Sequence, residues 1–489
     1  MLNEYAHGKP LSYPSTKCFL QYLNVEKRLL LTHRCPSLYR AEKTVPLHID
    51  FLLLASDHFV INNIQFSWGI IRQSSAKRKL LTAFKRDNAN GGLPYDLDKY
   101  GAEDKAELEN LSPGDIRIRD TDPDNQEVEE VEVRLMREDA KTLKKLKKLE
   151  KPNKGNLEEI VQLESKLFPW KNRRGNTRDC FPRYIKFQVK SEEGKYFKTE
   201  YLEYNKKLHE TMKYLTAKFF GGREIIGVQH LEVDLYNTVL RLPVNLKLRI
   251  KQKMSIGGNV ADVINPLGQI LGQFPSLDIV EVKYHWEFRD EKNFDHPLIR
   301  TAKSLEIVNY GEPDQFWFTI VPQIKSEIVS TFGGYVDSMD LGNLAATILE
   351  NRREIGTVYK IGLNEPKWFD DMYFLLHKHH EELQIGGEIR TLAGFGKKSS
   401  FEFTDLVIPM INKTSELHIY CGKNDEHDPN RYESPRFFVY FEVTPFETCD
   451  KSEFYKRLSI CILFVLTIAL IGIWVTDFFC WSASCTTLP

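Results

Sequence analysis

An uncharged run near the carboxyl end, Leu458–Thr476, is the feature that most constrains the fold. At about 1.5 Å per residue, a helix of this length matches a bilayer hydrocarbon core of about 30 Å. Lys451, Lys456 and Arg457 precede the run, and no Lys or Arg follows it. Because positively charged flanks stay on the cytosolic side, the sequence predicts a single-pass, tail-anchored membrane protein with its body in the cytosol. A fully buried core helix is the alternative interpretation.

Composition allows a substantial folded body in front of this run. The chain has 489 residues, of which 42% are hydrophobic and 28% charged, so two or three domains are expected. The net charge of −1 gives no general attraction to nucleic acid, and none is predicted as a partner. The 8 cysteines show no CxxC spacing, which favours a reducing compartment over a disulfide framework or a zinc site. Met1–Tyr13 has no apolar stretch typical of a signal peptide.

The order of apolar and charged segments predicts several modules. Residues 8–119 form a first module, in which apolar residues at helical spacing precede expected strands at Leu47–Leu54 and Phe59–Ile64. Residues 120–180 start acidic and then become lysine-rich, and their leucine stripe predicts a charged helical hairpin or short coiled coil. We expect this lysine-rich face to be solvated.

Residues 181–448 alternate between strand-like and helix-like segments. The overall expectation is an α+β or α/β fold with an irregular leucine-rich-repeat-like body, a transmembrane helix at 458–476 and a short tail at 477–489. A compact α+β domain is the alternative for the body. The repeated strand cores are His230-Leu231-Glu232-Val233, Ser276-Leu277-Asp278-Ile279, Ser304-Leu305-Glu306-Ile307 and Glu416-Leu417-His418-Ile419.

A search for chemistry yields no catalytic, cofactor or metal site. The segment at Gly394–Lys398 lacks both the first glycine and the final Ser or Thr of a phosphate-binding loop. His377, His379, His380, Glu381 and Glu382 are rich in metal ligands but lack the HExxH spacing. By elimination the body is expected to be a non-enzymatic recognition or scaffolding surface, acting through protein partners.

Several strings are more specific than composition. They are Lys9-Pro10-Leu11-Ser12-Tyr13-Pro14-Ser15, Arg34-Cys35-Pro36-Ser37-Leu38, Asn90-Gly91-Gly92-Leu93-Pro94-Tyr95-Asp96-Leu97-Asp98-Lys99-Tyr100-Gly101, Ser112-Pro113-Gly114-Asp115-Ile116, Tyr204-Asn205-Lys206-Lys207-Leu208-His209-Glu210 and Arg241-Leu242-Pro243-Val244. Over roughly residues 8–445 the chain resembles the nematode F-box C family, whose members carry a nematode-specific domain of unknown function.

The resemblance implies a substrate adaptor of a cullin–RING ubiquitin ligase, in which an F-box-like helical element within residues 8–119 binds Skp1 and the remainder presents a substrate. The run Leu458–Thr476 separately predicts that this adaptor is anchored in a membrane. Burial of the apolar side chains of the F-box-like element against a partner contributes about 25 cal/mol per Å². From the residues alone, the apolar side chains of this element fit the core of their own module equally well. The second functional hypothesis is a membrane-tethered scaffold without a ubiquitin link. The Skp1-facing candidates are Pro10, Leu11, Phe19, Leu20, Leu23, Leu29, Leu31 and Cys35.

Overall fold

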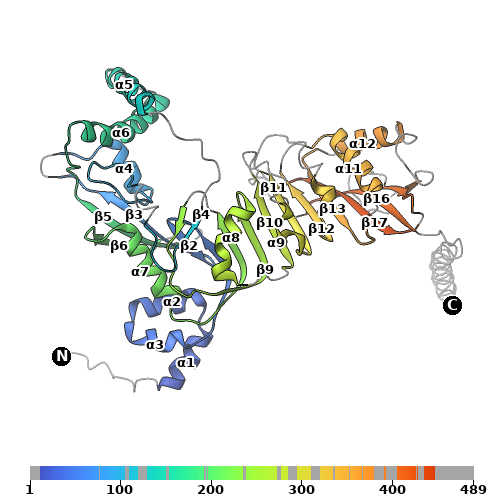
Figure 1. Cartoon of the computed structure of the whole chain (residues 1–489), viewed down its shortest axis with the longest axis horizontal. Coiled ribbons are helices and arrows are strands. Elements are labelled where there is room, and N and C mark those ends of the chain that lie inside the picture. The colour runs from blue at the N-terminus through green and yellow to red at the C-terminus, as the bar shows by residue number, and fades with distance from the viewer. Residues whose placement is uncertain are drawn as a thin grey trace, which may run out of the picture. The chain divides into compact units, whose positions relative to one another are not determined.

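The computed structural model describes residues 12–446 with internal gaps. The chain divides into two compact units, Met1–Tyr335 with Glu426–Pro435, and Val336–Asp425 with Arg436–Pro489. Each unit is considered by itself below (Figure 1). The gaps are residues 76–77, 105–109, 119–128, 150–152, 192–193, 195, 235–237, 273–276, 285–293, 310–319, 334–335, 352, 366, 379–389, 393–404, 413, 426 and 428–433.

Short helices open the first unit. The Ser12 side chain accepts a hydrogen bond from Ser15 N and caps the first helix, whose first turn also holds Pro14. Leu20 of this helix is fully buried and packs with Ala41 on a later helix. The helices therefore form a small module with its own apolar core. Their bounds are α1 Tyr13–Tyr22, α2 Val25–Arg34, the 3-10 turn η1 Pro36–Leu38 and α3 Tyr39–Lys43.

Antiparallel strands form one side of the sheet in the first unit, in the order β1-β2-β3-β5-β6. The expected strand Leu47–Leu54 is confirmed as β1. The expected strand Phe59–Ile64 is β2 only as far as Ile61, because the chain turns at residues 62–63 and Ile64 begins β3. The charged segment contains two packed helices, α5 and α6. The bounds are β2 His58–Ile61, β3 Ile64–Arg72, β5 Arg183–Ser191, β6 Tyr196–Glu203, α4 Thr82–Ala89, α5 Glu129–Leu146 and α6 Lys154–Arg174; β4 Ile116–Ile118 pairs separately with β8 Thr238–Leu240.

Parallel strands continue the same sheet from β1, in the order β1-β7-β9-β10-β11-β12. One residue from each strand forms a buried row across it: Leu231, Met254, Val280, Leu305 and Val329. α8 packs on β9, and Figure 1 shows α8 and α9 in front of these strands. The bounds are β7 Ile226–Asp234, β9 Leu248–Gly257, β10 Ile279–Tyr284, β11 Ser304–Asn309, β12 Ile328–Phe332, α7 Leu208–Phe220, α8 Val260–Leu271, α9 Pro297–Arg300 and the 3-10 turn η5 Val321–Gln323.

The second unit contains antiparallel strands in the order β14-β15-β16-β17-β13, with two helices that pack on each other. A buried core of aliphatic and aromatic side chains, including Tyr359, Ile419 and Phe441, lies within it. The bounds are α11 Ser338–Glu350, β13 Val358–Leu363, α12 Lys367–Lys378, β14 Arg390–Leu392, β15 Asp405–Pro409, β16 Ser415–Lys423 and β17 Phe437–Pro445.

The expected leucine-rich-repeat-like body is wrong. Its strand cores do lie in or beside β7, β10, β11 and β16, but they belong to mixed sheets rather than to one repeating arc. The β16 core pairs antiparallel in the second unit, whereas the others are parallel strands of the first. A short apolar alternation identifies a strand but does not identify the neighbour with which it pairs. The fold is therefore α/β with mixed sheets.

The expected membrane topology also needs correction. No helix in the part of the chain that the structure describes is both long and apolar enough to cross a bilayer. The predicted span Leu458–Thr476 lies outside the described residues. The tail-anchored, single-pass assignment is therefore not supported, and no membrane attachment is proposed below.

Candidate functional site

Half of the eight residues predicted to face a partner lie in the apolar interior of the N-terminal module. Leu20 and Leu29 are 0% and 2% exposed. Leu23 and Leu31 are partly buried and pack against the cluster around Leu20. These side chains hold the helices together, so they stabilise the module itself. Of the remaining candidates Phe19 is exposed, Cys35 is partly buried, and Pro10 and Leu11 lie outside the described residues.

The outer face of α1 carries an exposed apolar patch. Cys18, Phe19 and Tyr22 follow each other at helical spacing and therefore share one side of the helix. Phe19 is 46% exposed and Tyr22 is 85% exposed. Tyr22 was not among the predicted partner-facing residues, although its position three residues after Phe19 was a usable signal. This patch, Cys18–Phe19–Tyr22, contains one of the predicted partner-facing residues, Phe19, in an exposed position.

A buried ion-pair cluster fixes α3 to the rest of the unit. Glu42 is 0% exposed and forms ion pairs with Arg28, at 3.1 Å between Nε and Oε1, and with Arg223. Arg28 also donates two hydrogen bonds to the carbonyl oxygen of Pro46, each 3.1 Å long. Burial lowers the pKa of Arg28, and the carboxylate of Glu42 opposes this shift. Because Arg223 lies just after α7, the cluster joins the N-terminal module to the body.

Lys43 reinforces the same junction. Its Nζ donates to the carbonyl oxygens of Lys218, at 2.8 Å, and Phe219, at 2.9 Å, in the last turn of α7. A cation at this end of a helix interacts favourably with the helix dipole. Burial, together with the positive charge of Arg223, nevertheless lowers the pKa of Lys43 to about 7. The outer patch of α1 is therefore presented by a module that is anchored at several points.

The motif strings meet at the start of α7. The Asp96 carboxylate accepts hydrogen bonds from Leu208 N at 2.6 Å, His209 N at 3.1 Å and the Tyr204 hydroxyl at 2.5 Å. A carboxylate in this position satisfies amide groups of the first helical turn and suits its positive end. Two strings that are far apart in the sequence therefore share one structural task, which is to begin α7.

A second buried aspartate links two further strings. The Asp115 carboxylate accepts from Arg241 Nη1 at 2.8 Å, Lys213 Nζ at 2.5 Å and Ser112 N at 2.9 Å. Burial alone would raise the pKa of Asp115, but the hydrogen bonds from Lys213, Ser112 and Arg241 hold it below its ordinary value. Both aspartates are saturated with donors inside the fold. Their strings mark structural anchors rather than a reactive site.

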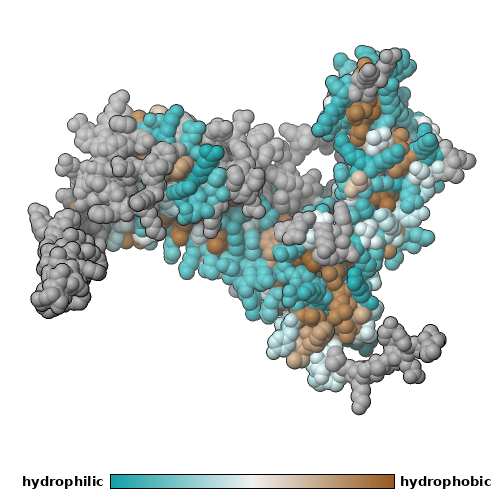
Figure 2. All heavy atoms as spheres, turned by 180° about the vertical axis from the view of Figure 1, so that it is seen from behind, coloured by the Kyte–Doolittle hydropathy of each residue, from teal (hydrophilic) through white to brown (hydrophobic). Residues whose placement is uncertain are grey.

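The parallel strands carry charged side chains on the face opposite their buried row. Lys253 Nζ lies 2.6 Å from carboxylate oxygens of both Glu281 and Glu306, on the two strands beyond its own. Lys283 forms a second ion pair with Glu232. Hydrophilic residues prevail on this side of the strands in Figure 2. Since parallel sheets usually bury both faces, a charged and partly exposed second face indicates a surface for binding.

The ion pair between Lys253 and Glu281 favours the charged form of both side chains. Burial tends to lower the pKa of Lys253, but hydrogen bonds to Glu281 and Glu306 raise it above its ordinary value. Burial tends to raise the pKa of Glu281, and the bond from Lys253 holds it below its ordinary value instead. Lys253 and Glu281 are therefore held as oppositely charged neighbours on this face, and such a pattern can select a partner of complementary charge.

His230 and Ser255 on this face lie close together, like the histidine and serine of a catalytic triad. The distance between His230 Nε2 and Ser255 Oγ is 2.7 Å, and Ser255 also hydrogen-bonds to Glu281. In a catalytic triad the histidine stands between serine and carboxylate, whereas here the serine stands in the middle. Ser255 is also 0% exposed. The arrangement therefore orders the sheet face and does not provide a substrate with an accessible nucleophile.

The described part of the chain contains no cluster of three or more His, Cys, Asp or Glu residues that could hold a metal ion. Of the ligand-rich stretch considered in the sequence, His379, His380, Glu381 and Glu382 lie outside the described residues.

Comparisons with known proteins add a domain but no activity. No curated protein matches the chain. Among solved structures, a CcbJ methyltransferase from Streptomyces caelestis is 12% identical over 40% of this chain and 83% of that chain, with a TM-score of 0.14. A likeness this weak carries no argument about fold or enzymatic activity. No comparison indicates an F-box or a ubiquitin-ligase component, so those assignments from the sequence have no support there. Residues 207–365, from the start of α7 to just beyond β13, match a domain of unknown function, DUF3557.

Proposed function

We propose that this chain is a protein-recognition adaptor, in which the N-terminal module binds one protein partner and the charged face of the parallel strands binds another. The proposal rests mainly on the exposed Cys18–Phe19–Tyr22 patch. This patch lies on a module that is anchored through Glu42 and Lys43. An aromatic patch on a rigid support loses little conformational entropy on binding and suits a protein interface.

The resemblance to the nematode F-box C family suggests the first partner, a Skp1-type protein. The substrate of the ligase would then meet the charged face around Lys253. In this reading the chain supplies recognition and positioning, and the ubiquitin-transfer chemistry belongs to the partners.

Binding of a purified Skp1-type protein to the full chain tests the first step. The double variant Phe19→Asp, Tyr22→Asp places charge in the interface and should weaken binding at least about tenfold, since interface aromatics are frequent hot spots. Tyr214→Asp is the matched control, because Tyr214 is a 65% exposed aromatic residue of α7, away from the patch. Absence of binding by the native chain, or equal binding by the double variant, would reject the Skp1-type partner.

A scaffold without a ubiquitin link is the second candidate, and α5 favours it. This helix exposes a basic stripe at helical spacing, formed by Arg137, Lys141 and Lys145. A scaffold acting through this stripe should retain its cellular partners in the Phe19→Asp, Tyr22→Asp variant. It should lose them in Lys141→Glu, Lys145→Glu. Cross-linking mass spectrometry of both variants separates the two functions by the surface from which the cross-links disappear.

A further inference from the structure

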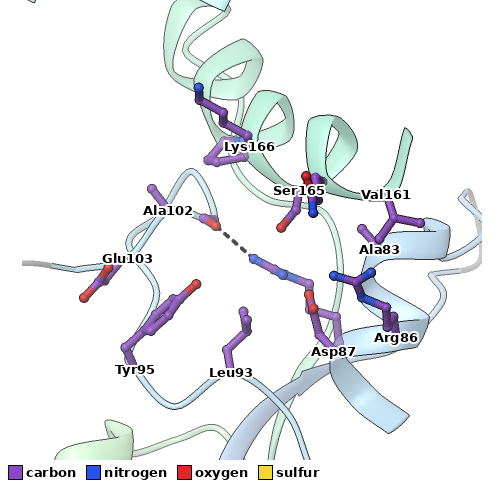
Figure 3. A pocket seen from close by; sticks show the side chains of 14 residues that line it. Ala83, Arg86, Asp87, Leu93, Tyr95, Ala102, Glu103, Val161, Ser165 and Lys166 are labelled. Carbon is purple, nitrogen blue, oxygen red and sulfur yellow. Dashed lines mark hydrogen bonds between the residues drawn. The ribbon is translucent and has the colours of Figure 1, made fainter. Parts of the chain in front are cut away.

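A cavity of about 420 Å³ lies between α4, the loop at residues 93–103 and α6, away from every surface considered above. Part of its lining is apolar, formed by Ala83 of α4, Leu93 of the loop, and Val161 and Pro169 of α6. Another part of the lining is polar. Figure 3 shows the side chains of Tyr95, Ser165 and Asp87 pointing into the space between them.

Tight backbone packing fixes the loop that supplies Tyr95. Gly92 has a φ of +101°, and a Cβ there would lie 2.8 Å from backbone atoms of Gly69 and Ile70. Ile70 and Leu93 exchange backbone hydrogen bonds of 2.8 and 2.9 Å. The turn Asn90-Gly91-Gly92 is thus pressed against β3. Tyr95 therefore stands on a rigid support rather than on a loose connection.

The positively charged residues that line the cavity already have carboxylate partners. Arg72 is buried, forms an ion pair with Asp179 at 3.4 Å and donates to the carbonyl of Gly101 at 2.9 Å, the bond dashed in Figure 3. Arg86 pairs with Glu158 at 3.5 Å. Lys166 likewise pairs with Asp139 at 2.9 Å.

Two acidic residues of the lining, Asp87 and Glu103, form no direct ion pair with any residue that the structure describes. Burial raises the pKa of Asp87, and the nearby positive charges of Arg72 and Arg86 oppose this shift without contacting its carboxylate. Asp87 Oδ2 is buried and accepts no hydrogen bond from a described residue. Tyr95 lies beside them, and its hydroxyl has no hydrogen-bond partner within the described ranges. A buried carboxylate oxygen without a donor is costly, and a ligand that supplies one removes the cost.

We propose that this cavity binds an organic cation, an alkylammonium or guanidinium group, with Asp87 as its counter-ion and the Tyr95 and Ser165 hydroxyls as further hydrogen-bond partners. The volume accommodates a small amine or one basic side chain, and the apolar lining of Leu93, Val161 and Pro169 accommodates its methylene groups. The cation can come from a free amine or from an arginine side chain of a bound protein.

Titration calorimetry of the full chain tests the site with agmatine and with the capped peptide acetyl-Gly-Gly-Arg-Gly-Gly-amide. Asp87→Asn keeps the shape of the side chain but removes its charge, and it should weaken binding of either probe at least about tenfold, as expected for a charge-assisted bond. Tyr95→Phe should cause a smaller loss. Asp278→Asn is the matched control, since Asp278 is an exposed aspartate outside the cavity.

The two probes also distinguish the source of the cation. Tighter binding of the peptide assigns an arginine side chain as the ligand, and tighter binding of agmatine assigns a free amine. Either result supports the site if Asp87→Asn weakens that binding by the expected factor. Undiminished binding by Asp87→Asn, or no heat from either probe at millimolar concentration, overturns the proposal. So does preferential binding of inorganic phosphate, because that would assign the cavity to Arg72, Arg86 and Lys166.

Discussion

Substitution of Glu42 by glutamine tests whether the buried ion-pair cluster holds the N-terminal module on the body. The change preserves side-chain length and one acceptor oxygen, but it removes the negative charge that lies between Arg28 and Arg223. Both guanidinium groups are about as buried as Glu42 itself, with side chains 3% exposed. Neither can recover its lost partner from water without opening the module.

The expected cost follows from the geometry. At the 3.1 Å separation of Arg28 and Glu42, two unit charges attract by about 5 kcal/mol at an effective dielectric constant of about 20. Removal of one member of a buried pair leaves uncompensated charge and costs about 3–5 kcal/mol. The bonds of Arg28 to the Pro46 carbonyl persist, so we expect the module to loosen rather than to unfold completely.

Hydrogen exchange, measured by mass spectrometry on the full chain, reports the loss of stability segment by segment. Amides of α2 and α3 should exchange about 10²- to 10³-fold faster in Glu42→Gln, while those of β16 in the second unit should be unaffected. Glu203→Gln, the same change at an exposed strand residue, is the control and should alter neither. An acceleration in α2 and α3 below about fivefold would refute the reasoning, because the ion pairs would then contribute little net stability.

Three further predictions concern single residues. Native stability should rise with pH between about 7 and 10.5, because Lys43 keeps its proton there only in the unfolded chain; Lys43→Met should abolish this rise in melting temperature across a pH series. Gly92→Ala should cost about 1–3 kcal/mol by urea denaturation, whereas Gly342→Ala, where a Cβ meets nothing, should not. The depressed pKa of Glu281 adds stability above its ordinary pKa of 4.5 that is lost as the pH falls, so Lys253→Gln should flatten the acid side of the stability profile, measured by the same denaturation.

Local elements were predictable where one periodicity dominates. The alternation in Leu47–Leu54 identifies β1 with its bounds. The helical spacing of Tyr204, Leu208, Met212, Leu215 and Phe219 predicts a helix, which the structure contains as α7; α7 begins only at Leu208, so Tyr204 lies before it. Gly221 ends that helix, as its sequence position indicated. These assignments depend only on near neighbours in the chain, which is why the sequence contains them.

The sheet order and the cavity depend on distant neighbours. β1 pairs with β7 across more than half of the first unit, and no local pattern encodes that partner. The side of α1 that faces inward was equally ambiguous, because Phe19 and Leu20 are adjacent apolar residues and only Leu20 is buried. Asp87, Tyr95 and Ser165 come from separate segments, so nothing in their spacing indicated a shared cavity.

Because β1 pairs with β7, the matched domain, residues 207–365, is not a segment that can fold on its own. A fragment restricted to residues 207–365 would expose the backbone of β7 as an open edge, a template for intermolecular strand pairing. It would also lack Asp96 and Asp115, so α7 would begin without its acceptors. We expect such a fragment to aggregate during purification, and residues 12–446, which keep both β1 beside β7 and β17 beside β13, to remain monomeric by size-exclusion chromatography. Sequence similarity delimits the part of this chain that is shared with other proteins, whereas stability is distributed over a longer segment.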